Sequence, residues 1–92
     1  MEPQPQESPD ADLTLREILR DVLGLPDEQV AGFDDATELF GALPELDSMA
    51  VNGLLTEMED RLGFIVDDDE LDGELFETFG NLLAFVRRKT AS

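Results

Sequence analysis

The chain has 92 residues, with 23 acidic against 6 basic side chains, a formal net charge of −17, and neither cysteine nor histidine. This length fits one small domain, and the lack of cysteine excludes disulfides and thiolate metal sites. The charge opposes binding to nucleic acid and to anionic membranes, and it favours encounters with basic protein surfaces. No apolar stretch approaches the length of a membrane span, so we expect a cytoplasmic protein without membrane insertion.

The first helix is predicted over residues 13–23. Before it, residues 1–11 contain three prolines and are expected to form a disordered lead-in, so that residues 12–92 make up the domain. The helix has an apolar stripe at i, i+3, i+4, i+7 spacing, made by Leu15, Ile18, Leu19 and Val22. Thr14 and Glu17 fit a capping box at its start, and Gly24 is expected to end it.

Residues 24–46 show no sustained periodicity and are predicted to form a long loop, pinned to the core by the apolar residues that recur through it. A second helix is predicted from Ser48 to about Leu62, with Gly63 at its end. Its apolar stripe is made by Val51, Leu54, Leu55, Met58 and Leu62. Ser48 is therefore expected to lie exposed at the N-terminus of this helix.

The remaining segments complete a small all-α bundle. Residues 64–66 form an apolar run that we interpret as a core-anchored turn, because the chain offers no second strand to pair with it. A short helix or turn is predicted around residues 71–76. The last helix is expected to start after Thr78, its N-cap, and to end in three cations that the helix dipole favours, Arg87, Arg88 and Lys89.

Ser48 is the candidate functional residue. A serine that follows an aspartate at a helix start is often an ordinary cap, but no Glu or Gln stands at the capping-box position here. The chain has neither a histidine to activate the hydroxyl nor a thiol of its own. The N-terminus of a helix also favours a phosphate attached there. We therefore interpret Ser48 as a residue that another enzyme modifies.

The acidic run at residues 67–70 partly fits a calcium-binding loop. With Asp68 at position one, Gly73 falls at the turn position, but Phe79 occupies the place of the closing bidentate glutamate. The chain also has no Gly-rich phosphate loop and no His-based metal site. We predict no bound metal and no enzymatic activity of its own.

The Asp47-Ser48-Met49 motif, the long loop before it and the helix that it opens resemble the acyl carrier protein family. The likeness continues through Leu62-Gly63-Phe64 and Val66-Asp67-Asp68, and the stretch from Phe76 to Gly80 is similar to the start of the family's last helix. The resemblance covers about residues 13–89. It implies a four-helix bundle with three long helices and one short helix.

The resemblance also implies a cofactor and partners. Ser48 would receive 4′-phosphopantetheine from coenzyme A through a separate magnesium-dependent phosphopantetheinyl transferase, and the arm's thiol would carry acyl groups as thioesters in fatty acid or polyketide biosynthesis. Asp47 matches the motif's aspartate, with an expected role in orienting the site at the transferase. The protein is expected to be a monomeric phosphoprotein that meets the basic surfaces of acyl-loading and acyl-transfer enzymes. The residues expected to bind these partners are Glu45, Met49, Glu57, Glu59 and Asp60.

Three residues depart from the family pattern. Asn52 falls where many fatty-acid carriers have an apolar residue, Gly53 replaces a glutamate, and Arg61 interrupts a face that is commonly acidic. A glycine in a helix interior costs about 1 kcal/mol relative to alanine, so a locally weakened helix is expected. The departures favour a discrete carrier of a dedicated pathway. A peptidyl or aminoacyl carrier and an unmodified acidic adaptor remain alternatives.

The cargo is expected to enter the bundle beside Ser48. The predicted entry lies between the second helix and the segment around residues 71–76, with Val51, Leu55 and Met58 on the helix side. Each buried methylene contributes about 0.8 kcal/mol, so a medium-length acyl chain would repay the disturbed packing and a two-carbon group would not.

Overall fold

Three long helices and one short helix make up the chain in the computed structural model, which describes residues 9–90. A single turn of 3-10 helix, η1, lies between the last two of them. In chain order the elements are α1 Pro9–Leu23, α2 Asp27–Ala31, α3 Ser48–Leu62, η1 Asp68–Glu70 and α4 Phe79–Thr90. This confirms the predicted all-α bundle, and α3 begins and ends as predicted. Residues 1–8 of the predicted lead-in lie outside the described residues.

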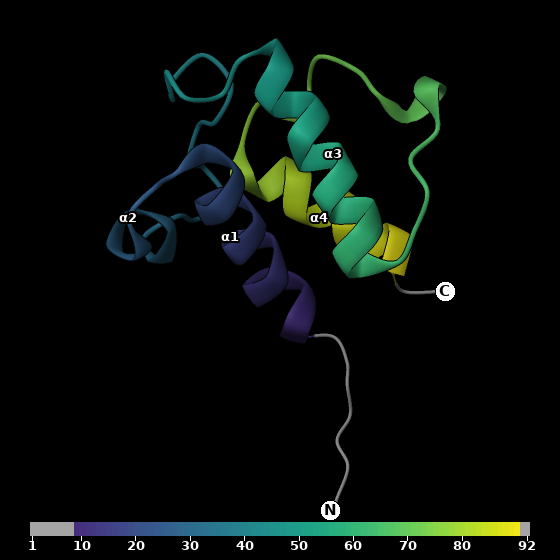
Figure 1. Cartoon of the computed structure of the whole chain (residues 1–92), viewed down its shortest axis with the longest axis horizontal. Helices are drawn as coiled ribbons and strands as arrows, with labels where there is room; N and C mark the ends of the chain where they lie inside the picture. The colour runs from purple at the N-terminus through teal and green to yellow at the C-terminus, as the bar shows by residue number, and fades with distance from the viewer. Residues whose placement is uncertain (1–8, 91–92) are drawn as a thin grey trace, which may run out of the picture.

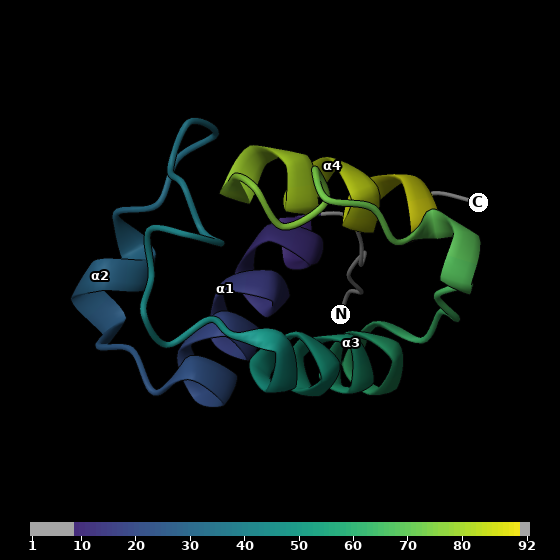
Figure 2. The same ribbon diagram turned by 90° about the horizontal axis from the view of Figure 1, so that it is seen from above.

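Helix α1 is the centre of the arrangement. It lies between α3 and α4, packs against both of them, and contacts α2 near its own C-terminal end (Figures 1 and 2). The apolar faces of the three long helices meet in a single core. Its fully buried side chains include Leu15, Ile18, Leu19, Leu54, Met58, Leu82, Phe85 and Val86. None of the helices within residues 9–90 is both long enough and apolar enough to cross a membrane.

The start of α1 differs from the prediction. The helix begins at Pro9 rather than at residue 13, because proline is tolerated in the first turn of a helix, where its missing N–H would have no partner. Ala11 is buried against the core, and Asp12 accepts a hydrogen bond from Arg16 one turn later. Thr14 and Glu17 therefore lie inside the helix, and the predicted capping box is wrong. Residues 9–11 of the expected lead-in belong to α1.

The connection between α1 and α3 contains the short helix α2, which the sequence analysis missed. With only five residues, α2 is too short to show a periodic stripe, and its single buried side chain is Val30. The rest of the connection is pinned to the core as predicted, by the buried side chains of Leu25, Phe33, Leu39 and Leu46. The short helix of the bundle is thus α2 and not the segment around residues 71–76.

A single arginine fastens α2 to α1. The guanidinium of Arg16 donates hydrogen bonds to the carbonyl oxygens of Val30 at 2.7 Å, Ala31 at 3.3 Å and Phe33 at 3.0 Å. The carbonyl groups at a helix C-terminus have no partner within the helix. Arg16 therefore supplies donors to the end of α2 and to the residues that follow it.

The segment between α3 and α4 is irregular. As predicted, residues 64–66 form no strand: Phe64 is buried and Val66 packs against the core, whereas Ile65 is 69% exposed. Around residues 71–76 the sequence predicts a short helix or a turn. Residues 73–77 form turns, so the turn is confirmed. The predicted N-cap of the last helix is also confirmed, because the Asn81 N–H donates to the Thr78 hydroxyl at 3.1 Å.

Main-chain hydrogen bonds tie this segment to the loop before α3. The N–H groups of Leu39 and Phe40 donate to the carbonyl oxygens of Glu77 and Phe76, each at 2.9 Å. Glu38 and Thr78 form an isolated antiparallel bridge beside them. These bonds hold Phe40 beside Phe76 although the two residues are far apart in the sequence.

Candidate functional site

Ser48 occupies the first position of α3, one residue after the helix cap. The cap is Asp47, whose Oδ1 accepts a hydrogen bond from the Ala50 N–H at 2.9 Å. Ser48 is exposed, as predicted, and its hydroxyl makes no hydrogen bond within residues 9–90. The interpretation of Ser48 as an ordinary cap is therefore wrong, because Asp47 performs that role. Among the described residues, nothing therefore engages the Ser48 hydroxyl.

The surroundings of Ser48 suit an attached phosphate. The free N–H groups and the dipole of a helix favour negative charge at its N-terminus, and α3 has 15 residues. Its first turn contains no acidic residue that would repel a phosphate. The helix also runs without interruption through Asn52 and Gly53, so the expected local weakening has not broken it.

Gly53 has a packing role that the sequence did not reveal. A Cβ at Gly53 would lie 3.3 Å from Cγ1 of Val22 on α1. The missing side chain therefore lets α1 and α3 approach closely, just beyond the first turn of the helix that carries Ser48. The departure from the family glutamate at this position is a feature of helix packing.

A groove of about 350 Å³ opens beside Ser48. Its lining residues come from α3 and from the segments on either side, namely Phe40, Ser48, Val51, Leu71, Asp72, Gly73 and Phe76. The groove lies where the acyl entry was predicted, with Val51 on one wall and the segment 71–76 on the other. Leu55 and Met58 do not line it, and Met58 is fully buried in the core.

Phe40 is the groove residue that the sequence analysis did not assign. Its ring is 50% exposed, and its main chain is fixed by the hydrogen bond to Phe76. The sequence shows an apolar residue before a glycine in a long loop, which indicates a turn but not its place in space. That place depends on contacts between segments that are distant in the chain.

The predicted partner-binding residues fall into two groups. Glu57 accepts a hydrogen bond from Arg61, four residues later in α3, at 2.9 Å, and Glu59 accepts one from the Val66 N–H at 2.8 Å. These two carboxylates are committed to the protein's own structure. Glu45, Met49 and Asp60 are exposed and make no side-chain hydrogen bond within residues 9–90.

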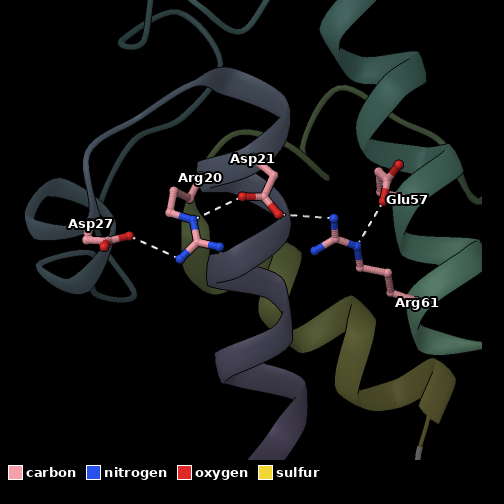
Figure 3. A network of polar contacts seen from close by, with 5 residues as sticks. All are labelled: Arg20, Asp21, Asp27, Glu57 and Arg61. Carbon is pink, nitrogen blue, oxygen red and sulfur yellow. Dashed lines mark hydrogen bonds and ion pairs between the residues drawn. The ribbon is translucent and has the colours of Figure 1, made fainter.

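Arg61 is neutralised by two neighbours. Besides Glu57, it contacts the Asp21 carboxylate at 3.0 Å, and Asp21 also accepts from Arg20, which in turn reaches Asp27 at 3.1 Å (Figure 3). The network joins α1, α2 and α3. Hydrogen bonds from Arg20 and Arg61 lower the pKa of the Asp21 carboxyl, and the hydrogen bond to Asp21 raises the pKa of Arg61.

The acidic run after α3 serves the fold. Glu70 accepts hydrogen bonds from the Asp67 N–H at 3.0 Å and from the Lys89 ammonium at 2.9 Å, which lower the pKa of its carboxyl. In the described part of the chain, no three acidic side chains are grouped so that they could hold a metal ion. The part of the run that includes Glu70 fastens η1 to the end of α4.

Comparison with known proteins agrees with this geometry. The family described as a phosphopantetheine attachment site matches residues 13–86. The chain is similar to the solution NMR structure of a holo acyl carrier protein from Nitrosomonas europaea, with 40% sequence identity and a TM-score of 0.80. That alignment covers 92% of this chain and 100% of the other. No curated protein matches the sequence significantly.

The fold and the free serine define a small helical carrier domain. The chain belongs to the acyl carrier protein family of phosphopantetheine-binding proteins. It is a carrier and not an enzyme, and its prosthetic group is a covalently attached phosphopantetheine. This replaces the alternative of an unmodified acidic adaptor.

Proposed function

We propose that the phosphopantetheine arm is attached at Ser48 and that the protein carries acyl groups for a dedicated biosynthetic pathway. The observation that carries the proposal is the uncommitted Ser48 hydroxyl at the first position of α3, with Asp47 capping the helix in its place. Once attached, the arm supplies a thiol that holds an acyl group as a thioester. The missing cysteine of the chain is consistent with this source of sulfur.

Attachment requires a separate enzyme. A bond forms between Ser48 Oγ and the phosphorus that carries the pantetheine group of coenzyme A, and the bond from that phosphorus to the adenosine bisphosphate leaving group breaks. The proton of the hydroxyl passes to a general base in the complex with the transferase. Asp47 uses Oδ1 as a cap, and its other carboxylate oxygen is available to the transferase and its magnesium ion. Because coenzyme A is the donor, we place the protein in the cytoplasm. We also propose that it acts as a monomer.

The groove beside Ser48 favours acyl over peptidyl cargo. Phe40, Val51, Leu71 and Phe76 give it apolar walls. An alkyl chain gains free energy from burial against such walls, whereas a peptide amide would lose hydrogen bonds to water there. A groove of this kind supports an acyl group of medium length as the cargo.

Intact-mass spectrometry after incubation with coenzyme A and a broad-specificity phosphopantetheinyl transferase tests the attachment site. The wild type should gain one phosphopantetheine, and Ser48→Ala should gain none while keeping its helical circular dichroism. The matched control replaces the chain's other serines, Ser8 and Ser92, by alanine together and should still be modified. Modification that persists in Ser48→Ala would disprove the assignment of Ser48.

A further inference from the structure

Helix α4 is the one helix within residues 9–90 that contains no acidic residue. A quarter of the chain is acidic, 23 of 92 residues, yet the 12 residues of α4 contain no carboxylate and end in Arg87, Arg88 and Lys89. The helix dipole favours these cations in the last turn, but it would also favour acidic residues in the first turn, where α4 has none. The dipole therefore does not account for the charge of this helix.

The exposed side of α4 is small and then cationic. Asn81, Ala84, Arg87 and Arg88 are all exposed, and their spacing of three and four residues places them on one side of the helix. We call these four residues the α4 outer face. The buried residues of α4 point into the core that it shares with α1 and α3, so the outer face points away from both helices.

The two arginines of the outer face are available to a ligand. Arg88 forms no ion pair within residues 9–90, and Arg87 has only Asp12 at 3.9 Å, with its own side chain 59% exposed. The guanidinium carbon of Arg88 lies 5.4 Å from the centre of the buried Phe85 ring. Stacking on this ring restricts the guanidinium, so less freedom is lost when it binds an anion. The other four basic side chains are engaged in ion pairs, namely Arg16, Arg20, Arg61 and Lys89.

The neighbours of the outer face limit the width of such a ligand. A groove of about 240 Å³ separates α4 from the segment before it, and Glu70, Asp72 and Glu74 lie on its far wall. Asp12 of α1 lies on the side of Arg87. A membrane or a nucleic acid is a broad anionic surface that would also meet these carboxylates, and it would be repelled. A narrow chain segment with aspartate or glutamate side chains can reach the arginines alone, and carboxylates match the planar guanidinium in shape.

A ligand on the outer face leaves Ser48 uncovered. Helices α3 and α4 lie on opposite sides of α1, and the end of α4 that carries the arginines lies at the same end of the bundle as the end of α3 (Figures 1 and 2). Ser48 is at the opposite end of α3, at its first position. The two surfaces can therefore be occupied at the same time.

We propose that the α4 outer face is a second docking surface, which binds an acidic segment of a partner protein through Arg87 and Arg88. Charge complementarity selects this occupant, because the outer face is cationic in a chain with a net charge of −17. The bound partner holds the carrier while another protein acts at Ser48. The binding itself does not depend on which residue carries the arm.

A titration followed by NMR tests the surface. The probe is a hexaglutamate peptide blocked at both ends, added to the ¹⁵N-labelled protein with its arm attached, in about 0.05 M salt so that screening is weak. The largest chemical-shift changes should fall on the amides of the outer face and on the side-chain N–H groups of Arg88. Changes that are absent, or that fall elsewhere on the molecule, would overturn the proposal.

Substitutions of single arginines separate a specific surface from an effect of net charge. Arg88→Gln should weaken peptide binding about tenfold, and Arg88→Lys, which keeps the charge and its place at the helix end, should weaken it less. Arg20→Gln is the matched control: it removes the same charge from an arginine engaged in ion pairs, and it should change the Kd less than about twofold. Equal losses for Arg20→Gln and Arg88→Gln would overturn the proposal, because binding would then follow net charge alone.

The other possible occupants give different results. Tighter binding to phosphatidylglycerol vesicles or to a short oligothymidine strand than to the peptide would overturn the assignment to a protein partner. Phosphopantetheine transfer to Arg88→Gln should stay within about twofold of the wild type, since the lost charge acts only on long-range steering. A much larger loss would place Arg88 in the surface that the transferase covers and would overturn a second docking surface.

The titration also separates this proposal from the attachment site. Ser48→Ala should bind hexaglutamate as the wild type does. If Ser48→Ala is still modified by the transferase, the assignment of Ser48 fails while the outer face stands. If the peptide leaves the spectrum of the wild type unchanged, the outer face fails while the assignment of Ser48 stands.

Discussion

The guanidinium carbon of Arg16 lies 4.6 Å from the centre of the Phe79 ring, so one cation joins three elements of the fold. The same guanidinium bonds to the carbonyl oxygens at the end of α2, while Phe79 opens α4 and is almost fully buried. A planar group with several donors can serve carbonyl oxygens and stack on a ring at the same time. Arg16 is therefore a structural residue, although the chain has few basic residues.

Arg16→Lys should lower the free energy of unfolding by about 1 to 3 kcal/mol, because an ammonium group cannot reach all three carbonyl groups and stack on the ring. Urea unfolding followed by circular dichroism gives the value. Arg20→Lys on the same helix is the matched control and should cost less, since Arg20 is more exposed and contacts only carboxylates. If the two variants lose the same free energy of unfolding, the hydrogen bonds from Arg16 to the carbonyl groups contribute no more to stability than the surface ion pairs of Arg20.

Two glycine positions should respond differently to alanine. A Cβ at Gly80 would lie 2.6 Å from the carbonyl oxygen of Asp35, which is main chain and cannot easily move, so Gly80→Ala should cost about 1 to 3 kcal/mol. At Gly53 the neighbour is a methyl group of Val22 at 3.3 Å, and alanine gains about 1 kcal/mol of helix propensity. Gly53→Ala should therefore be much less destabilising in the same urea experiment. The reverse order would contradict this account of the packing.

The pairing of Glu70 with Lys89 should show in the pH dependence of stability. The pKa of the Glu70 carboxyl is lowered from an ordinary value of 4.5 by the hydrogen bonds from the Asp67 N–H and the Lys89 ammonium. The contribution to stability is therefore complete above about pH 4.5 and is lost as the pH falls through the lower pKa of the folded state. Glu70→Gln should melt below the wild type at pH 7, and the gap should close toward pH 3. Asp69→Asn, a neighbour without this pairing, should show no such gap.

Acyl loading should raise the melting temperature once the chain is long enough to enter the groove. Each buried methylene is worth about 0.8 kcal/mol, so an acetyl group should have little effect and a medium-length chain a clear one. Melting curves of the protein loaded with acetyl, butyryl, hexanoyl and octanoyl groups provide the series. Leu71→Ala shortens one wall of the groove and should reduce the slope of the series. A flat series in the wild type would mean that the cargo stays in solvent.

Salt should act in opposite directions on folding and on association. Screening relieves the self-repulsion of a chain with a net charge of −17, so the melting temperature should rise as sodium chloride increases from about 0.01 M to about 1 M. Over the same range the association rate with a basic transferase should fall. Stopped-flow fluorescence and calorimetry measure the two trends. An association rate that ignores salt would exclude electrostatic steering.

The sequence predicts the parts of this fold that have strong local signals. The stripe of α3 and its terminal Gly63, with φ at 78°, define that helix without tertiary information, and the same holds for the Thr78 cap of α4. The start of α1 cannot be predicted from the sequence, because a proline-rich stretch indicates disorder, whereas the burial of Ala11 is a tertiary effect. Helix α2 cannot be predicted either, because five residues with a single buried side chain show no periodic pattern.

The candidate site divides in the same way. Ser48 and Asp47 are adjacent in one motif, so both can be singled out from the sequence as candidate site residues. Which of the two caps α3 cannot be predicted, since capping depends on which side chain reaches the Ala50 N–H. The position of Phe40 depends on contacts between segments distant in the chain. The hydrogen bond from the Val66 N–H to Glu59 depends on the path of the chain after α3, whereas the pair of Glu57 and Arg61 has ordinary helical spacing. The partner-binding role of Glu45, Met49, Glu57, Glu59 and Asp60 stays a prediction.

The position of the cap has a consequence for turnover of the arm. Because Asp47 and not Ser48 satisfies the Ala50 N–H, esterification of the serine removes no hydrogen bond from α3. Attachment of the prosthetic group and its removal by hydrolysis therefore require no change in the fold of the protein. The protein with the arm and the protein without it should then be degraded by proteases at the same rate.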